Sequence, residues 1–288
     1  MRRLLCRGMG YLSIVALALL VCPAEIIAYT FKTYIPVRER KPLPAYCFLP
    51  QQGADSPLPA VLVGVGVGST KIVQYHDHCQ NLANRGFVVV LIDPSNYPES
   101  LAPGPYDWDR GPGYVVGSIN QGVVAARLVF TDKWYLDSIR AVVDYLVHWP
   151  LVDPSRIALS GHSQPANAAL TYACRDPRIK AVIWNYGGSP WVTPYDPLRL
   201  PPVQIFHGED DDVYSVKYAR KLAFELKTNM RPYEVNIYPH QKHMFNVFYN
   251  LRTENRYTKP ALLDAFERLV CFLHSTLNIP YRSTRPRG

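Results

Sequence analysis

The sequence is poor in charge: only 19% of its 288 residues are Asp, Glu, Lys or Arg, whereas 48% are hydrophobic. Disordered chains show the opposite balance, so this composition excludes a chain without a packed core. No internal repeat is visible, and no composition shift separates the chain into two cores. A length of 288 residues suits one large domain.

The sequence also lacks a stretch dense in Lys and Arg, although its net charge is +8. Residues 1–28 have a net charge of +2 and residues 281–288 have +3, which leaves only +3 for the body of the chain. A nucleic-acid-binding body is therefore not expected. We expect the tail over 281–288 to be flexible, and the basic ends leave open a contact with an anionic membrane or envelope surface.

Beyond the N-terminus there is no hydrophobic run of about 20 residues, the length that a membrane-spanning helix needs. Residues 1–8 are basic, residues 11–22 are largely apolar, and Ala28 offers a small residue for cleavage. This three-part layout predicts a secretory signal peptide over 1–28, with an uncleaved anchor as the alternative. We therefore expect an exported protein, periplasmic or secreted.

Cysteine is scarce, with six residues in total, of which four follow the predicted signal peptide. These are Cys47, Cys79, Cys174 and Cys271. In an exported protein four cysteines allow up to two disulfides in three pairings. The alternative is that they are buried free thiols, and the sequence does not choose between the two.

Motifs for a metal or a phosphate are missing as well. His76, His78 and Cys79 fall in a predicted helix but lack the i, i+4 histidine pair of a zinc-binding helix. The glycine-rich run from Gly64 to Lys71 lacks the G-x-x-x-x-G-K-[ST] order of a phosphate-binding loop. We expect no cofactor and no metal.

What the sequence does contain is an alternation of apolar strands and helices. Strands are expected at 29–37, 45–49, 60–65, 87–92, 156–160, 179–184, 203–206 and 233–238, and helices at 72–85, 132–149, 163–174, 216–226 (capped by Ser215) and 262–273. The strands are apolar on both faces, as in a parallel sheet covered by helices on both sides. The sequence therefore predicts a single α/β domain over residues 29–280.

Residues 94–131 show no periodic pattern and are rich in Gly, Pro and Tyr. This segment is too long for an ordinary connection in a compact domain, where long loops are usually functional or disordered. We expect it to be a loop that covers a site.

A strand, a sharp turn and a helix meet at Gly161-His162-Ser163-Gln164-Pro165. This is the setting of a nucleophile elbow, in which the serine hydroxyl projects above the sheet. The N–H groups at the start of the following helix can stabilise an oxyanion. Ser163 is therefore a candidate nucleophile, and the alternative is that it only caps the helix.

Two later strand ends supply an acid and a base in the order that follows such a serine. Residues 206–213 contain a run of four acidic residues, and residues 238–245 contain His240 and His243. Both segments follow strands, and the carboxyl ends of parallel strands are where sites form in open α/β sheets. The acidic run alone could equally be a solvated turn or a cation site.

With these motifs, residues 43–275 resemble the α/β-hydrolase superfamily and specifically its dienelactone-hydrolase-like branch. The resemblance implies the α/β-hydrolase fold, a mostly parallel central sheet flanked by helices on both faces. It places the nucleophile on Ser163, the acid on Asp211 and the base on His243. Asp210 and Asp212 remain alternatives for the acid and His240 for the base, although the spacing from Tyr238-Pro239 and the following Met244-Phe245 favour His243.

The same resemblance implies two oxyanion donors, the backbone N–H groups of Gln164 and Val67. The family's founding enzymes carry cysteine as the nucleophile, so the serine here argues against a dienelactone substrate and favours a general serine esterase. Pro165 stands where the elbow normally closes with glycine. Proline is tolerated in a first helical turn but disfavours helical geometry at the residue before it, Gln164.

The sequence thus predicts an exported serine hydrolase that cleaves small-molecule carboxylic esters through an acyl-enzyme, without a cofactor. Two alternatives remain: an inactive binding protein of the same fold, and a peptidase or acyltransferase of the same fold. The sequence does not indicate the natural substrate or the oligomeric state.

Overall fold

The computed structural model describes residues 30–38, 40–50, 57–66, 73–94, 133–188, 195–247 and 258–279. The predicted signal peptide, the predicted oxyanion donor Val67, nearly all of the 94–131 loop and the basic tail at 281–288 lie outside these residues. The expectation of a single domain over 29–280 stays a prediction.

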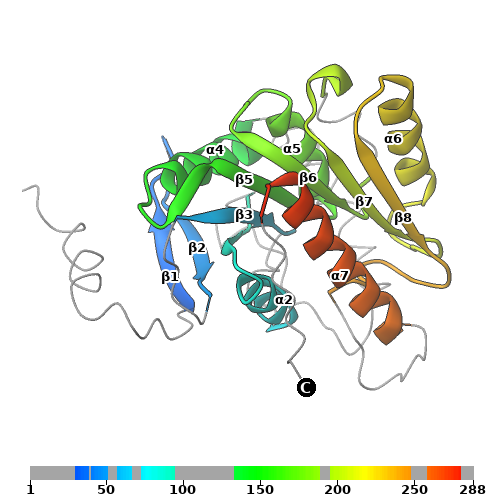
Figure 1. The fold of residues 1–288 in the computed structure, drawn as a ribbon, viewed down its shortest axis with the longest axis horizontal. Coiled ribbons are helices and arrows are strands. Elements are labelled where there is room, and N and C mark those ends of the chain that lie inside the picture. Colours follow the sequence, from blue (N-terminus) through cyan, green and yellow to red (C-terminus); the bar gives the residue numbers. More distant parts are fainter. Residues whose placement is uncertain are drawn as a thin grey trace, which may run out of the picture.

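The strands of the described part of the chain form one eight-stranded sheet (Figure 1). Its strands are β1 (Thr30–Ile35), β2 (Leu43–Phe48), β3 (Leu58–Gly64), β4 (Val88–Ile92), β5 (Val152–His162), β6 (Ile179–Asn185), β7 (Val203–Gly208) and β8 (Tyr233–Tyr238). Their spatial order is β1-β2-β4-β3-β5-β6-β7-β8. β2 runs antiparallel to both β1 and β4, and all other neighbours are parallel. The predicted mostly parallel sheet is confirmed.

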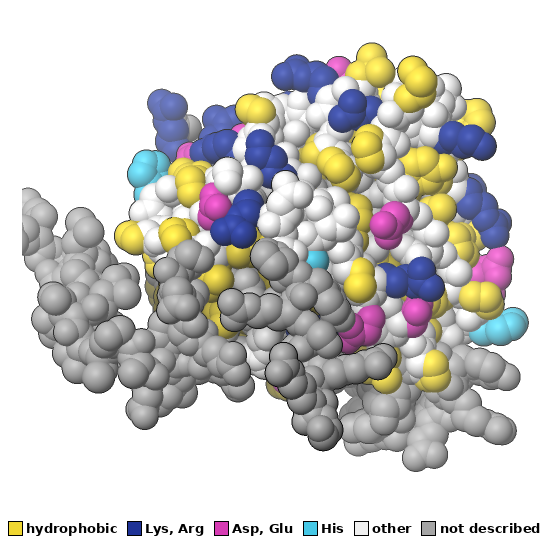
Figure 2. Space-filling view, in the orientation of Figure 1, with side chains coloured by type: hydrophobic (Ala, Val, Ile, Leu, Met, Phe, Trp, Pro, Cys, Tyr) yellow, Lys and Arg dark blue, Asp and Glu magenta, His cyan; other side chains and the backbone are white. Residues whose placement is uncertain are grey.

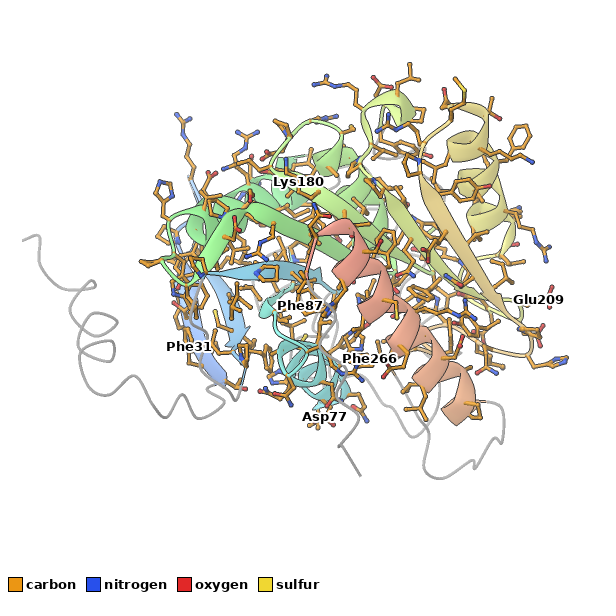
Figure 3. The ribbon with its side chains drawn as sticks, viewed as in Figure 1. Phe31, Asp77, Phe87, Lys180, Glu209 and Phe266 are labelled. Atoms are coloured by element: carbon orange, nitrogen blue, oxygen red, sulfur yellow. The ribbon has the colours of Figure 1, made fainter. Side chains whose placement is uncertain are left out.

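Helices cover both faces of this sheet (Figure 1). α4 (Lys133–Val147), α5 (Gln164–Ala173) and α6 (Lys217–Thr228) pack on one face, and α2 (Val73–Ala83) and α7 (Thr258–Thr276) pack on the other. A short 3₁₀ helix, η4 (Pro197–Arg199), precedes β7. All five residues of β4 are buried, which explains why its sequence is an unbroken apolar run. In Figure 3, Phe266 on α7 and Asp77 on α2 mark the second face.

Two local expectations differ from the structure. β5 begins at Val152, whereas the sequence predicted a start at residue 156. The sequence reasoning missed these residues because Asp153–Arg156 are partly or fully exposed and show no apolar pattern. The predicted cap of α6 is also displaced: Val216 occupies the N-cap position. Ser215 lies one residue earlier, and its hydroxyl accepts only a long 3.4 Å hydrogen bond from the Lys217 N–H.

The four cysteines left open by the sequence are all free. Cys47, Cys79 and Cys174 are buried, and Cys271 is exposed on α7. The alternative of buried free thiols therefore holds for three of them, and the structure contains none of the three possible pairings.

Lys and Arg side chains are scattered over the visible described surface rather than gathered in one stripe (Figure 2). This agrees with the small net charge of the body of the chain. Among the described residues, none of the helices is both long and apolar enough to cross a membrane.

Candidate active site

Ser163 occupies the sharp turn between β5 and α5, with φ 65° and ψ −127°. An L-residue rarely adopts a positive φ, and such strained backbone persists where the surrounding structure enforces it. Here the Ser163 N–H donates to Asn185 O at 3.0 Å, and Ser163 O accepts from Ala166 N at 3.1 Å. Ser163 is the N-cap residue of α5, but its side chain makes no capping hydrogen bond to the helix, so capping does not account for its hydroxyl.

Gly161 is required by close approach, because α5 begins directly over it. A Cβ at this position would lie 2.4 Å from Ala166 Cα and 2.5 Å from Pro165 O, both of them backbone atoms. Real Cβ atoms do not come this close to backbone. The glycine therefore lets the start of α5 lie against the end of β5, which sets the sharpness of the turn.

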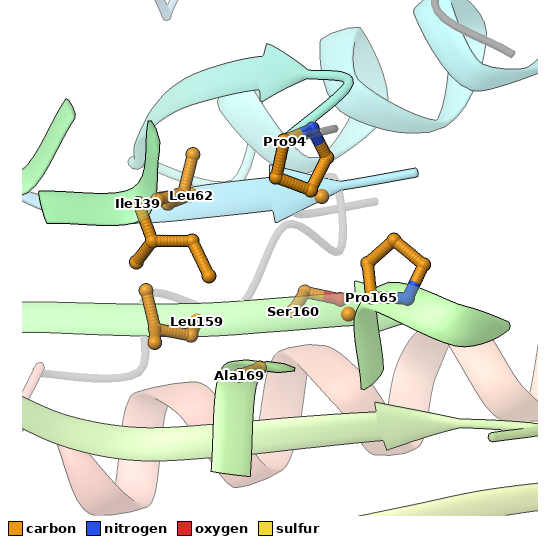
Figure 4. A pocket seen from close by; sticks show the side chains of 9 residues that line it. Leu62, Pro94, Ile139, Leu159, Ser160, Pro165 and Ala169 are labelled. Atoms are coloured by element: carbon orange, nitrogen blue, oxygen red, sulfur yellow. The ribbon is translucent and has the colours of Figure 1, made fainter. Parts of the chain in front are cut away.

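Pro165 does not break the elbow. α5 begins at Gln164, with Pro165 in its first turn, where a missing N–H removes no intrahelical hydrogen bond. Figure 4 shows the Pro165 ring close to Pro94, and a Cβ on Gly64 would stand 3.5 Å from Pro165 Cβ. The cavity that Pro165 helps to line measures about 10 Å³, which is room for one water molecule. It is too small for a substrate and is a packing gap below the turn.

His243 lies next to the serine, although 80 positions separate them in the chain. Its Nε2 is 3.0 Å from Ser163 Oγ, and its Nδ1 is 2.8 Å from Asp211 Oδ2. Both distances are those of well-formed hydrogen bonds. The His243 side chain is only 8% exposed. The structure therefore joins the three residues that the resemblance selected in one hydrogen-bonded chain.

The Asp211 carboxylate is fully buried and its two oxygens have separate partners. Oδ1 accepts the backbone N–H groups of Val213 and Tyr214, both at 2.8 Å. Oδ2 faces His243 and also lies 3.3 Å from His207 Nε2, which donates to Tyr214 O at 2.8 Å. These contacts fix the carboxylate so that one oxygen always faces the His243 ring.

His207 therefore supports the acid from below, as a structural residue. Burial lowers its pKa below the ordinary value, although the Tyr214 carbonyl and Asp211 oppose this effect. Its side chain is completely buried and its ring stacks on Trp184, with 5.7 Å between the ring centroids.

The competing acids and base point to the surface. Asp210 lies 3.5 Å from His240, and Asp212 lies 3.5 Å from Lys242, and both contacts are exposed. Glu209, the first residue after β7, lies at the edge of the molecule in Figure 3. Within the acidic run, only Asp211 turns inward toward the histidine.

One of the two predicted oxyanion donors can be located. Gln164 is the first residue of α5, and the first N–H groups of a helix have no partner inside the helix. Its N–H therefore stands directly after the serine, at the positive end of the helix dipole. The second, Val67, lies outside the described residues, three positions after the end of β3.

A layer of buried polar side chains lies beneath the serine and the histidine. His162 Nδ1 is 2.7 Å from Tyr186 Oη, and its Nε2 is 3.2 Å from Ser160 Oγ. The Tyr186 ring in turn packs edge-on against the His243 ring at 4.7 Å. Burial lowers the pKa of His162 well below its ordinary value and raises that of Tyr186 well above it, so both stay neutral.

The polar layer includes residues that the sequence reasoning missed. His162 packs under the site and does not line it, being 1% exposed. The missed residues are Asn185, Tyr186 and Asn246. A signal existed for the first two, since strand β6 ends in Asn185 and Tyr-Gly-Gly follows it at the carboxyl edge of the sheet.

The His76–Cys79 run forms no metal site. The His76 ring packs edge-on against Tyr46 and Phe48, whereas His78 is buried against His162. Among the residues that the structure describes, no group of three or more His, Cys, Asp or Glu side chains could hold a metal ion.

Comparisons with known proteins agree with this architecture. A sequence model of the dienelactone hydrolase family matches residues 43–277. A Yersinia pestis protein named as a candidate carboxymethylenebutenolidase is 24% identical over 244 residues, which cover 79% of this chain and 82% of that protein.

Two solved structures share the fold. A candidate dienelactone hydrolase from Klebsiella pneumoniae subsp. pneumoniae superposes with a TM-score of 0.65 at 20% identity, covering 85% of this chain and 98% of the other. An esterase from Pyrobaculum calidifontis superposes with a TM-score of 0.62 at 20% identity, covering 87% of each chain. The predicted α/β-hydrolase fold is confirmed.

The family match spans most of the sheet and all of the segments that carry Ser163, Asp211 and His243. The chain therefore belongs to the dienelactone hydrolase family and is a hydrolase by family membership.

Proposed function

We propose that the protein is a serine hydrolase that cleaves carboxylic esters through an acyl-enzyme on Ser163. The observation that carries the proposal is the hydrogen-bonded chain Ser163–His243–Asp211, with distances of 3.0 and 2.8 Å. A serine hydroxyl is a weak nucleophile until a base accepts its proton, and a histidine held by a carboxylate supplies that base.

In the first half of the reaction, His243 Nε2 accepts the Ser163 proton while Oγ attacks the ester carbonyl carbon. The negative charge moves to the carbonyl oxygen, and the Gln164 and Val67 N–H groups are the donors we assign to it. The imidazolium then gives its proton to the departing alcohol as the C–O bond breaks. The acyl group stays on Ser163.

In the second half, His243 accepts a proton from a water molecule, whose oxygen attacks the acyl carbonyl. The tetrahedral intermediate collapses, the proton returns to Ser163 Oγ, and the carboxylic acid leaves. Asp211 holds the Nδ1–H tautomer of His243 and stabilises the imidazolium that forms twice in each cycle.

The test is the hydrolysis of short-chain p-nitrophenyl esters by the purified protein. We expect Ser163→Ala to reduce the rate to that of buffer. Ser155→Ala, at the exposed start of the same strand, is the matched control and should keep the wild-type rate. A wild-type rate in Ser163→Ala would refute the mechanism.

Two parallel measurements separate the alternatives of the same fold. A fluorophosphonate probe should label Ser163 in the wild-type protein, and a protein that hydrolyses nothing and takes no label is an inactive relative. A peptidase would cleave amide substrates of the same acyl group at least as well as the esters.

A further inference from the structure

Asn185 is the last residue of β6, in register with His162 on the neighbouring strand β5. It is 1% exposed. A buried side-chain amide is costly unless its donors and its acceptor are bonded, so its partners indicate what it does.

Three of its hydrogen bonds go to the strand and turn that carry the serine. Its backbone O accepts from Ser163 N at 3.0 Å. Its side-chain Nδ2 donates to Gly161 O at 3.1 Å and to Ser160 Oγ at 3.2 Å. Because Gly161 O can only accept, the amide orientation is fixed and its oxygen must face the other way.

That oxygen meets the segment that carries the base. Asn246 Nδ2 donates to Asn185 Oδ1 at 2.8 Å, and Asn246 is 5% exposed. Asn246 follows His243 by three residues, inside a turn closed by the hydrogen bond from Val247 N to Met244 O at 3.0 Å. A shift of Asn246 would therefore shift the histidine.

Asn185 thus contacts both halves of the site through buried hydrogen bonds. Ser163 and His243 are 80 positions apart in sequence, and their Oγ–Nε2 distance must stay near 3.0 Å for proton transfer. The amide pair is a short path between the backbone around the serine and the backbone beside the histidine.

We propose that Asn185, with Asn246 as its partner, is a positioning residue that sets the distance between Ser163 and His243. The inference rests on the proposed serine mechanism. Both side chains are buried, and each acts through the backbone of the segment it holds.

The test compares four variants with the wild-type protein: Asn185→Leu, Asn246→Leu, the double variant, and Gln204→Leu. Gln204 is the matched control, because it is a fully buried amide at the opposite end of β7. It donates to Glu234 and to Arg268 O, far along the strand from Gly208 and the site. The readouts are kcat and KM for a p-nitrophenyl ester, together with the melting temperature.

We expect each asparagine variant to lower kcat by up to about 100-fold, as misplacements of about 1 Å do, with KM little changed. The kcat of the double variant should be no lower than that of the more severe single variant, because both single variants remove the same hydrogen bond between Asn185 and Asn246. Gln204→Leu should lower the melting temperature while its kcat stays at the wild-type value.

If the wild-type protein hydrolyses the ester and the asparagine variants keep its kcat, this inference alone is overturned. If the wild-type protein is inert and Ser163 takes no fluorophosphonate label, the serine mechanism falls and this inference with it. Asn246→Leu lies in a loop, so it decides the matter even if Asn185→Leu does not fold.

Discussion

Asp211→Asn is the substitution whose effect follows most directly from the hydrogen bonds of the site. Oδ1 of Asp211 accepts two backbone N–H groups, from Val213 and Tyr214. In the variant, the amide oxygen must keep that position, since an NH₂ group would face two donors. The NH₂ group is then directed at His243 Nδ1, at the 2.8 Å position of the present Oδ2.

An NH₂ group at that position donates to Nδ1 and forces the proton of His243 onto Nε2. The ring then offers Ser163 a donor instead of an acceptor, so it cannot take the serine proton. The corresponding change in a serine protease lowers kcat about 10⁴-fold. This equals a loss of about 5 kcal/mol of transition-state stabilisation, at 1.36 kcal/mol per factor of ten.

The assay is kcat for a p-nitrophenyl ester, with ¹⁵N chemical shifts of the histidines as an independent report on the tautomer. Asp210→Asn and Asp212→Asn are the controls, because both carboxylates are exposed and pair with surface side chains. We expect both controls to keep the wild-type kcat. An Asp211→Asn protein within tenfold of wild type would refute the reasoning.

The remaining predictions concern a close backbone contact and a buried histidine. Gly161→Ala should lower the free energy of unfolding by about 1–3 kcal/mol and reduce ester hydrolysis, because the new Cβ would overlap the backbone of α5. Gly64→Ala should do neither, because the atom nearest to its new Cβ would be 3.5 Å away. Burial lowers the pKa of His78 from 6.5 to about 4 in the folded state. As the pH falls, the unfolded chain therefore takes up this proton before the folded protein does. The free energy of unfolding keeps its full value above pH 6.5 and decreases by about 3 kcal/mol as the pH falls to 4. Urea unfolding across that range should show a flatter pH dependence for His78→Phe, and an unchanged slope would contradict this origin.

Much of the sheet could be predicted because burial leaves a direct mark on the sequence. β4 is a continuous apolar run, and β6 is apolar from Ala181 to Trp184, since helices cover both of their faces. The polar first half of β5 carries no such mark. Its position depends on pairing with β3, where the hydrogen bond from Leu58 N to Leu151 O begins the alignment.

The site was predictable to the level of motifs, and less so to the level of contacts. The family pattern selected Asp211 from a run of acids, and its inward orientation depends on the turn that presents the N–H groups of Val213 and Tyr214. The Asn185–Asn246 bond joins segments 61 residues apart. No local pattern encodes such a pair, because it arises only when the end of β6 and the turn after β8 meet at one edge of the sheet.

The central claim is that Ser163 carries the acyl group during turnover. The most direct measurement is rapid quenching of the protein with p-nitrophenyl acetate, followed by mass spectrometry of its peptides. We expect an acetyl group on the peptide containing Ser163 in the wild-type protein, and no acetyl group on that peptide in Ser163→Ala. Ester hydrolysis that proceeds with no acyl adduct on Ser163, or with the adduct on another residue, would contradict the account.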